Sequence, residues 1–265
     1  MTIAWEAAGG GAEKVLFIQG AGVPGAGWKP QLAGLSDRFH CASFDNRGTG
    51  KSRRADGAFT IDDWRADALE VLDALGWERA HVVGHSLGGL VAQSLALEAR
   101  ARVASLTLMC TFHRGAEASR LSPWIVWTGL RTYVGTRSMR RRAFLEILLS
   151  PAERAARASA LDDYAAELAP LFGRDLGDPA AIAMKQLGAA AKHDVRARLA
   201  ELADVPTLVV SGAHDRLALP AFGRALAAAI PGARFVECDA AHGLPITRAD
   251  ETNRLVAEHV QSARG

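Results

Sequence analysis

Residues 84–89 read Gly84-His85-Ser86-Leu87-Gly88-Gly89 and stand between an apolar run at 80–83 and a helical pattern at 87–100. A serine in Gly-x-Ser-x-Gly at such a junction lies on a turn so sharp that small residues must flank it, in strained and exposed backbone. The amides and dipole at the start of the following helix favour negative charge on an attacked carbonyl. Ser86 is therefore the candidate nucleophile. The competing interpretation is a chance match in a chain with 26 glycines.

Short apolar runs alternate with helical patterns on both sides of this stretch. Continuous apolar runs separated by helices are typical of strands buried on both faces of a parallel sheet. We therefore expect an α/β fold, with strands at 15–18, 41–44, 81–83, 105–109, 207–210 and 234–237, and helices at 61–75, 87–100, 221–229 and 249–263.

The alternation breaks between residues 112 and 195, where no strand-like run occurs. Helix start signals mark this part instead: Ser150-Pro151 with Glu153 is typical of a capping box, and Asp178-Pro179 predicts the start of a further helix. We predict a catalytic core of residues 1–111 and 196–265, interrupted by a helical cap, or lid, at 112–195.

Composition favours small-molecule chemistry. The chain has 265 residues, and its 31 basic and 29 acidic residues give a net charge of +2. This balance creates no field strong enough to indicate nucleic acid or an anionic membrane as the main partner. Nothing in the sequence predicts an oligomeric state.

Cysteine usage and the N-terminal residues favour a soluble cytoplasmic protein. Cys41, Cys110 and Cys238 are odd in number and far apart, as expected of buried small hydrophobes rather than a disulfide framework. No Cys-x-x-Cys spacing indicates a metal. The start of the chain lacks the features of a signal peptide, and no apolar run approaches the roughly 18 residues of a membrane span.

A serine nucleophile needs a general base that a carboxylate orients. Among eight histidines His242 is best placed, because it follows the run at 234–237 on a loop of turn residues. Asp215 follows the run at 207–210 in the same way, and ligands bind at the carboxyl ends of parallel strands. The alternatives are a solvated loop histidine, Asp215 as a helix cap, and Asp239 as the acid, although Asp239 lies only three residues before His242.

With these residues in order, the chain resembles the α/β-hydrolase fold superfamily, specifically its single-cap serine esterase, lactonase and perhydrolase-like branch. The resemblance rests on Gln19-Gly20-Ala21-Gly22, the loop at 45–52, the stretch at 84–89 and the late acid and histidine. It implies a mostly parallel sheet flanked by helices, with the cap inserted after the sixth strand. It also implies the roles of nucleophile, acid and base for Ser86, Asp215 and His242.

The resemblance extends to an oxyanion hole made of backbone amides. One amide comes from Leu87, and the other comes from the loop after the third strand, where Ala21 is expected and Gly22 is the fallback. Relatives commonly have histidine where this chain has Gln19, whose amide can still hydrogen-bond the loop. Ser86 excludes dehalogenase and epoxide hydrolase relatives, which need a carboxylate at that position.

A dinucleotide site is the rival interpretation. Residues 20–25 satisfy Gly-x-Gly-x-x-Gly after an apolar run, and Asp45 follows 20 residues beyond Gly25. Pro24, Gly25 and Gly27 fall where the phosphate-binding helix would run and would break it. A third interpretation is a hydrolase fold retained for binding alone.

Charge is unevenly divided within the predicted cap. Residues 112–142 contain seven arginines and one acid, whereas residues 143–178 contain seven acids and three arginines. One interpretation is that the basic half steers an anionic substrate toward Ser86. The interpretation that we favour is a solvated face on which the two halves form ion pairs between helices. Trp124 and Trp127, with Leu130, follow helical spacing and are candidates either for the pocket roof or for the stripe that packs the cap on the core.

The sequence thus predicts a cofactor-independent and metal-free hydrolase of a small to medium carboxylic ester or lactone, acting through an acyl-enzyme. Enol-lactone, thioester and C–C bond hydrolysis remain open as alternatives on the same fold.

Overall fold

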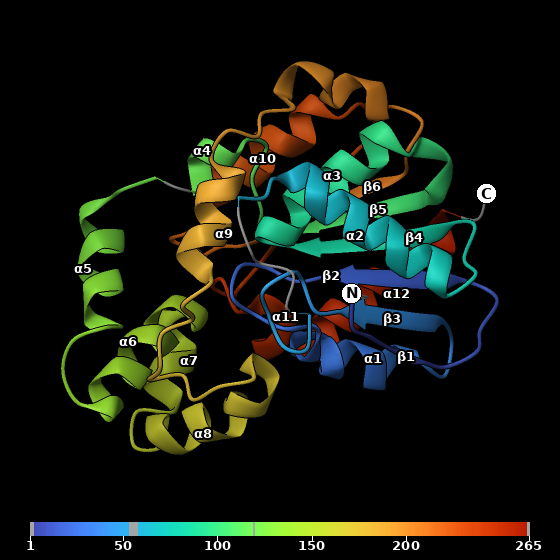
Figure 1. Ribbon diagram of the computed structural model, residues 1–265. Helices are drawn as coiled ribbons and strands as arrows, with labels where there is room; N and C mark the ends of the chain where they lie inside the picture. Colours follow the sequence, from blue (N-terminus) through green and yellow to red (C-terminus); the bar gives the residue numbers. More distant parts are fainter. Residues whose placement is uncertain (1–2, 53–57, 119, 264–265) are drawn as a thin grey trace.

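The computed structural model describes residues 3–52, 58–118 and 120–263. Their core is a seven-stranded sheet in the order β1-β3-β2-β4-β5-β6-β7, in which β1 is antiparallel to β3 and every other neighbouring pair is parallel (Figure 1). The strands are β1 (Trp5–Ala8), β2 (Lys14–Ile18), β3 (His40–Phe44), β4 (Ala80–His85), β5 (Val103–Met109), β6 (Thr207–Gly212) and β7 (Arg234–Cys238).

The burial of each strand explains whether it could be predicted from the sequence. All residues of β4 and β6 are buried, as expected of strands covered on both faces, and the six predicted runs all form strands. The α/β prediction is confirmed. Strand β1 was not predicted, because its residues are exposed or half-buried at the sheet edge and form no apolar run.

Helices cover the sheet in two groups that Figure 1 separates: α2 packs on α3, and α1 packs on α12. The Thr60 hydroxyl accepts a hydrogen bond from the Asp63 amide, and the Asp63 carboxylate accepts one from the Thr60 amide, so α2 begins with the capping box that its sequence indicates. The core helices are α1 (Lys29–Leu35), α2 (Ile61–Ala74), α3 (Leu87–Glu98), α10 (Pro220–Ala229), α11 (Leu244–Thr247) and α12 (Ala249–Ser262), with short 3-10 helices η1 (Gly25–Trp28), η2 (Arg100–Arg102) and η3 (Arg196–Leu202).

Between β5 and β6 the described chain is helical. The helices are α4 (Gly115–Ala118), α5 (Pro123–Arg131), α6 (Arg137–Leu148), α7 (Pro151–Ala156), α8 (Leu161–Phe172) and α9 (Ala183–Ala190). Helices α5 to α8 lie together to one side of the sheet (Figure 1). Buried side chains of α6 and α8, with Leu161 and Phe172 at the two ends of α8, form a second apolar cluster there.

Two details of this segment differ from expectation. Asp178-Pro179 does not begin a helix: α9 begins at Ala183, and the Asp178 carboxylate pairs with Arg137. The segment follows β5 and the loop at 19–22 follows β2, whereas the family resemblance implies a sixth and a third strand before them. The sheet of the described residues begins at Trp5 and so has one strand fewer before each position.

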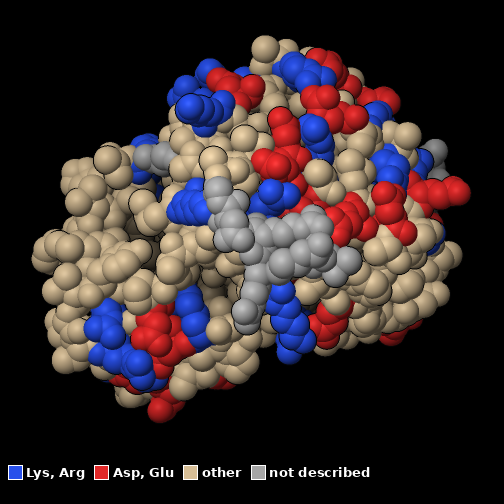
Figure 2. All heavy atoms as spheres, viewed as in Figure 1, with Lys and Arg blue, Asp and Glu red and all other residues tan. Residues whose placement is uncertain are grey.

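Ion pairs join the basic and acidic halves of the segment. The pairs are Arg131 with Glu146, Arg137 with Asp178, Arg141 with Asp175 and Arg142 with Asp162. Figure 2 shows blue and red side chains intermixed over α6 and α8, whereas the surface over α5 is mostly tan. This arrangement agrees with ion pairing rather than with a basic patch that steers a substrate. None of the helices in the described part has the length and apolar character to span a membrane.

Candidate active site

Ser86 lies at the sharp turn between β4 and α3. Its φ of 54° and ψ of −121° place a non-glycine residue in a strained region of backbone conformation. A Cβ on Gly84 would collide with the Gly88 carbonyl, and a Cβ on Gly88 would collide with the carbonyl oxygen of Ile18. The turn therefore requires glycine at these two positions, because α3 packs directly against β4 and against the end of β2.

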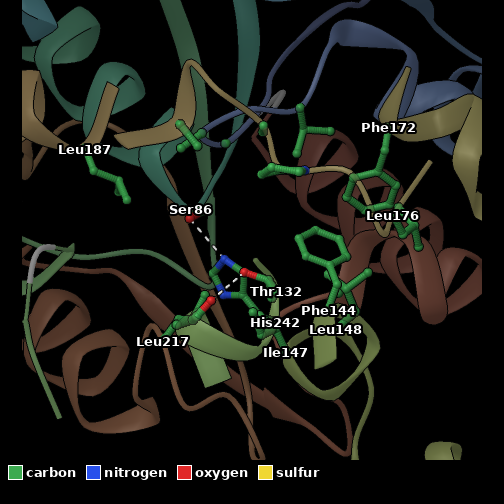
Figure 3. Close-up of a pocket in the computed structure, with 18 of the residues that line it drawn as sticks. Ser86, Thr132, Phe144, Ile147, Leu148, Phe172, Leu176, Leu187, Leu217 and His242 are labelled. Atoms are coloured by element: carbon green, nitrogen blue, oxygen red, sulfur yellow. Dashed lines mark hydrogen bonds between the residues drawn. The ribbon is translucent and has the colours of Figure 1, made fainter. Parts of the chain in front are cut away.

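A chain of hydrogen bonds connects Ser86 to His242 and Asp215 (Figure 3). His242 Nε2 lies 3.0 Å from Ser86 Oγ, and His242 Nδ1 lies 2.8 Å from Asp215 Oδ2. The other carboxylate oxygen of Asp215 accepts the amides of Leu217 and Ala218 at 2.8 and 2.9 Å. The Asp215 side chain has no exposed surface, so the imidazole is held with Nε2 toward the serine hydroxyl, the geometry for accepting its proton.

The competing acid points elsewhere. Asp239 Oδ1 lies 2.9 Å from Nε2 of His214, on the surface. Because Asp239 has that partner and Asp215 contacts His242, the structure brings together the three residues that the sequence analysis selected.

His85 supports the loop of His242 from inside the fold. Its Nε2 donates to the His242 carbonyl at 2.9 Å, and its Nδ1 lies 3.0 Å from Gln19 Oε1. Burial, reinforced by the neighbouring His242, lowers the pKa of His85 to about 3. His85 is therefore neutral at physiological pH. The Gln19 side-chain oxygen also accepts the Gly20 amide at 2.8 Å, so Gln19 forms the expected hydrogen bond to the loop at 19–22.

Two backbone amides near Ser86 are available to a ligand. Neither the Ala21 amide nor the Leu87 amide has an acceptor among the described residues. The Gly22 amide, by contrast, donates to Gln186 Oε1 at 2.6 Å. Gly22 is therefore not available as the fallback donor.

Sequence reasoning missed Gln186, a fully buried residue of α9. Besides accepting the Gly22 amide, its Nε2 donates to the Arg47 carbonyl at 3.0 Å. The side chain thus ties α9 to two core loops. A single glutamine in a helical pattern gives no sequence signal for this role.

A mostly apolar cavity of about 290 Å³ opens beside Ser86 and His242. Figure 3 shows both groups at its wall, with Phe144 and Phe172 across from Ser86. Further lining side chains come from the helical segment and from the core, among them Trp124, Ile147, Leu148, Leu176, Leu187 and Leu217.

Two pocket predictions were wrong: Gly22 and Trp127 do not line the cavity. The Gly22 amide instead faces Gln186, and the Trp127 side chain is 60% exposed. Helix α5 lines the cavity with Trp124 and, one turn later, Thr128. The lining face thus follows i, i+4 spacing, whereas Trp127 at i+3 lies beyond its edge.

Nothing in the described residues assembles a metal or dinucleotide site. No group of three or more His, Cys, Asp or Glu side chains there is placed to hold a metal ion. The Asp45 carboxylate, which a dinucleotide ribose would need, accepts the amides of Gly25 and Lys51 at 2.8 and 2.7 Å. Helix α1 begins only at Lys29, after η1, so no long helix opens at the glycines.

The fold and the Ser86 turn are those of an α/β hydrolase, and comparison with known proteins agrees. The family model described as alpha/beta hydrolase fold matches residues 14–249, and the chain belongs to this family. "Putative carbamate hydrolase RutD" of Caulobacter segnis is 30% identical over 262 residues, covering 96% of this chain and 93% of that protein. "3-oxoadipate enol-lactonase 1" of Acinetobacter baylyi is 27% identical over 253 residues, covering 95% of this chain and 90% of that protein.

A solved structure is similar over nearly the whole chain. The enol-lactonase from Burkholderia xenovorans LB400 has a TM-score of 0.79 and 30% identity, and the match covers 98% of this chain and 96% of that one. Membership of a hydrolase family implies a small-molecule substrate.

Proposed function

We propose that this protein is a serine hydrolase that cleaves a small to medium carboxylic ester or lactone through an acyl-enzyme. The observation that supports it most strongly is the hydrogen-bonded series Ser86, His242 and Asp215, starting from a strained serine at the mouth of an apolar cavity. The proposed reaction needs no cofactor or metal.

In the proposed mechanism Ser86 Oγ attacks the substrate carbonyl carbon and His242 Nε2 takes its proton. Asp215 orients the ring and stabilises its charged form. The amides of Leu87 and Ala21 stabilise the oxyanion, each contributing about 3 kcal/mol to the lowering of the barrier. His242 then protonates the leaving alkoxide, and a water that His242 activates cleaves the acyl-enzyme.

We propose further that residues 112–195 are the cap of this enzyme, with the remainder as the catalytic core. The cavity supports this division, because core residues such as Leu217 and segment residues such as Phe144 and Leu187 line it together. Substrate choice would then depend on how α5 to α9 pack over Ser86. The three free, buried cysteines support a reducing, cytoplasmic location.

Carbamate hydrolysis is a second candidate, because relatives such as the Caulobacter segnis protein are named for it. The enol-lactonase names of other relatives favour the lactone form of the first proposal. Rates on matched aryl esters, lactones, thioesters and carbamates separate these candidates. Thioester and C–C bond hydrolysis have no specific support in the structure.

Labelling with a fluorophosphonate tests the proposal. The reagent should attach to Ser86, and Ser86→Ala should lose both labelling and ester hydrolysis. An unlabelled but folded protein would favour a fold retained for binding alone. A melting temperature raised by NAD or NADP would favour the dinucleotide interpretation.

A further inference from the structure

Two charged side chains, Arg174 and Asp178, stand in the mostly apolar wall of the cavity. Arg174 lines the cavity that contains Ser86. It lies in the chain between Phe172 and Leu176, which Figure 3 shows across the cavity from Ser86. Its guanidinium carbon lies 5.0 Å from the centre of the Phe144 ring. A positive charge is therefore held on the wall remote from the serine.

The Arg174 guanidinium is only partly satisfied by the protein. Nη1 donates to the backbone carbonyls of Asp175 and Asp178, whereas Nε is buried and has no acceptor among the described residues. A buried donor without an acceptor destabilises a fold by about 1–3 kcal/mol. Burial also lowers the pKa of Arg174, although the charge persists at physiological pH.

The nearest carboxylates are bonded to other arginines. Asp175 pairs with Arg141, whose donation holds the pKa of Asp175 far below its usual range. Asp178 pairs with Arg137 at 3.2 Å. In the described part of the chain, Arg174 thus forms no ion pair of its own, whereas Asp178, a carboxylate that shares the cavity wall with it, has Arg137 as its partner.

We propose that Arg174 binds a carboxylate of the substrate, so that the preferred ester or lactone is negatively charged at the end remote from the bond cleaved. This inference rests on the proposed function of Ser86. A guanidinium offers a planar pair of N–H donors that fits a carboxylate, and an apolar wall weakens the screening of their attraction. A neutral analogue would leave the positive charge of Arg174 without a counterion at this wall, which is how such a site discriminates.

A purely structural role for Arg174 is the alternative, since its carbonyl contacts pin the loop at 173–178. Arg140 provides the matched control, because its Nε donates to the Gly177 carbonyl of the same loop at 2.6 Å and it does not line the cavity. Arg140→Met loosens the loop without removing charge from the cavity wall.

The experiment measures kcat/KM for pairs of substrates that differ only in charge. Nitrophenyl hemiesters of dicarboxylic acids of increasing length are compared with the same compounds capped as methyl esters. A second series has the carboxylate in the alcohol part. The protein should prefer the charged member roughly tenfold or more at one chain length. Arg174→Met should reduce the ratio of charged to neutral roughly 10- to 100-fold, and Arg140→Met should retain it.

Two results would overturn the inference: no charge preference at any length in either series, or an equal loss of preference in both variants. A protein that hydrolyses neutral and charged esters alike contradicts only the role of Arg174. A protein that hydrolyses none of them and leaves Ser86 unlabelled contradicts the proposed function, and this inference fails with it.

Discussion

The side-chain oxygen of Gln186 accepts the amide of Gly22 at 2.6 Å and thereby bonds α9 to the loop next to Ser86. The two residues are 164 positions apart in sequence. The contact occupies the Gly22 amide, whereas the adjacent Ala21 amide has no acceptor among the described residues. The position of the helical segment and the position of the proposed oxyanion donor are therefore coupled.

Gln186→Leu should lower kcat roughly tenfold or more while KM changes less, because the Gly22 amide loses its acceptor and the Ala21 donor is no longer fixed. The variant should also unfold at a lower temperature, since a buried amide and the Arg47 carbonyl lose their partners, at about 1–3 kcal/mol. Steady-state kinetics and thermal unfolding check both effects. An unchanged kcat would show that the oxyanion loop does not depend on α9.

Asp215→Asn should reduce kcat by roughly a thousandfold or more, because an amide neither stabilises the charged imidazole nor maintains the tautomer that presents Nε2 to Ser86. The matched control is Asp239→Asn, whose carboxylate lies on the surface beside His214. Its kcat should stay near that of the unchanged protein. If the two variants lost activity equally, the acid of the mechanism would have been misassigned.

Gly88→Ala should destabilise the fold by about 1–3 kcal/mol, because the new Cβ collides with the Ile18 carbonyl at the end of β2. Gly188→Ala is the comparison, since this glycine of α9 has nothing within 4 Å of an added Cβ. It should be neutral or stabilise the protein by up to about 1 kcal/mol. Denaturant titration of both variants measures the difference, and equal effects would refute close packing at the Ser86 turn.

His85 should make folding acid-sensitive. Its pKa is about 3 in the folded protein against an ordinary value of 6.5. Between these values the unfolded chain binds a proton that the folded chain does not, so the free energy of unfolding falls as pH falls, by at most about 1.4 kcal/mol per unit. His85→Gln should have a shallower dependence in urea titrations over this range. Because the pKa values of His193 and His259 are also lowered, only the difference between the curves reports on His85. Parallel curves would contradict a neutral buried His85.

Sequence patterns predicted the sheet and the approach of Ser86, Asp215 and His242, because each lies at the carboxyl end of a parallel strand and such ends share one edge. Short-range signals of this kind do not depend on how distant helices pack. Strand β1 was missed because an exposed edge strand needs no apolar run.

The cavity wall was harder to predict, because the docking of the helical segment determines it. Trp127 was selected at i+3 from Trp124, but the lining face of α5 follows i+4 spacing. Gln186 and Arg174 acquire their positions only through contacts with residues far away in the chain or in neighbouring helices. No local pattern distinguishes them from other polar residues on helices.

Mass spectrometry of protein quenched during turnover of a nitrophenyl ester detects the proposed acyl-enzyme itself. We predict a mass increase equal to the acyl group, located on the peptide that contains Ser86 and absent from Ser86→Ala. Turnover without acylation, or acylation of another residue that persists in Ser86→Ala, would contradict it.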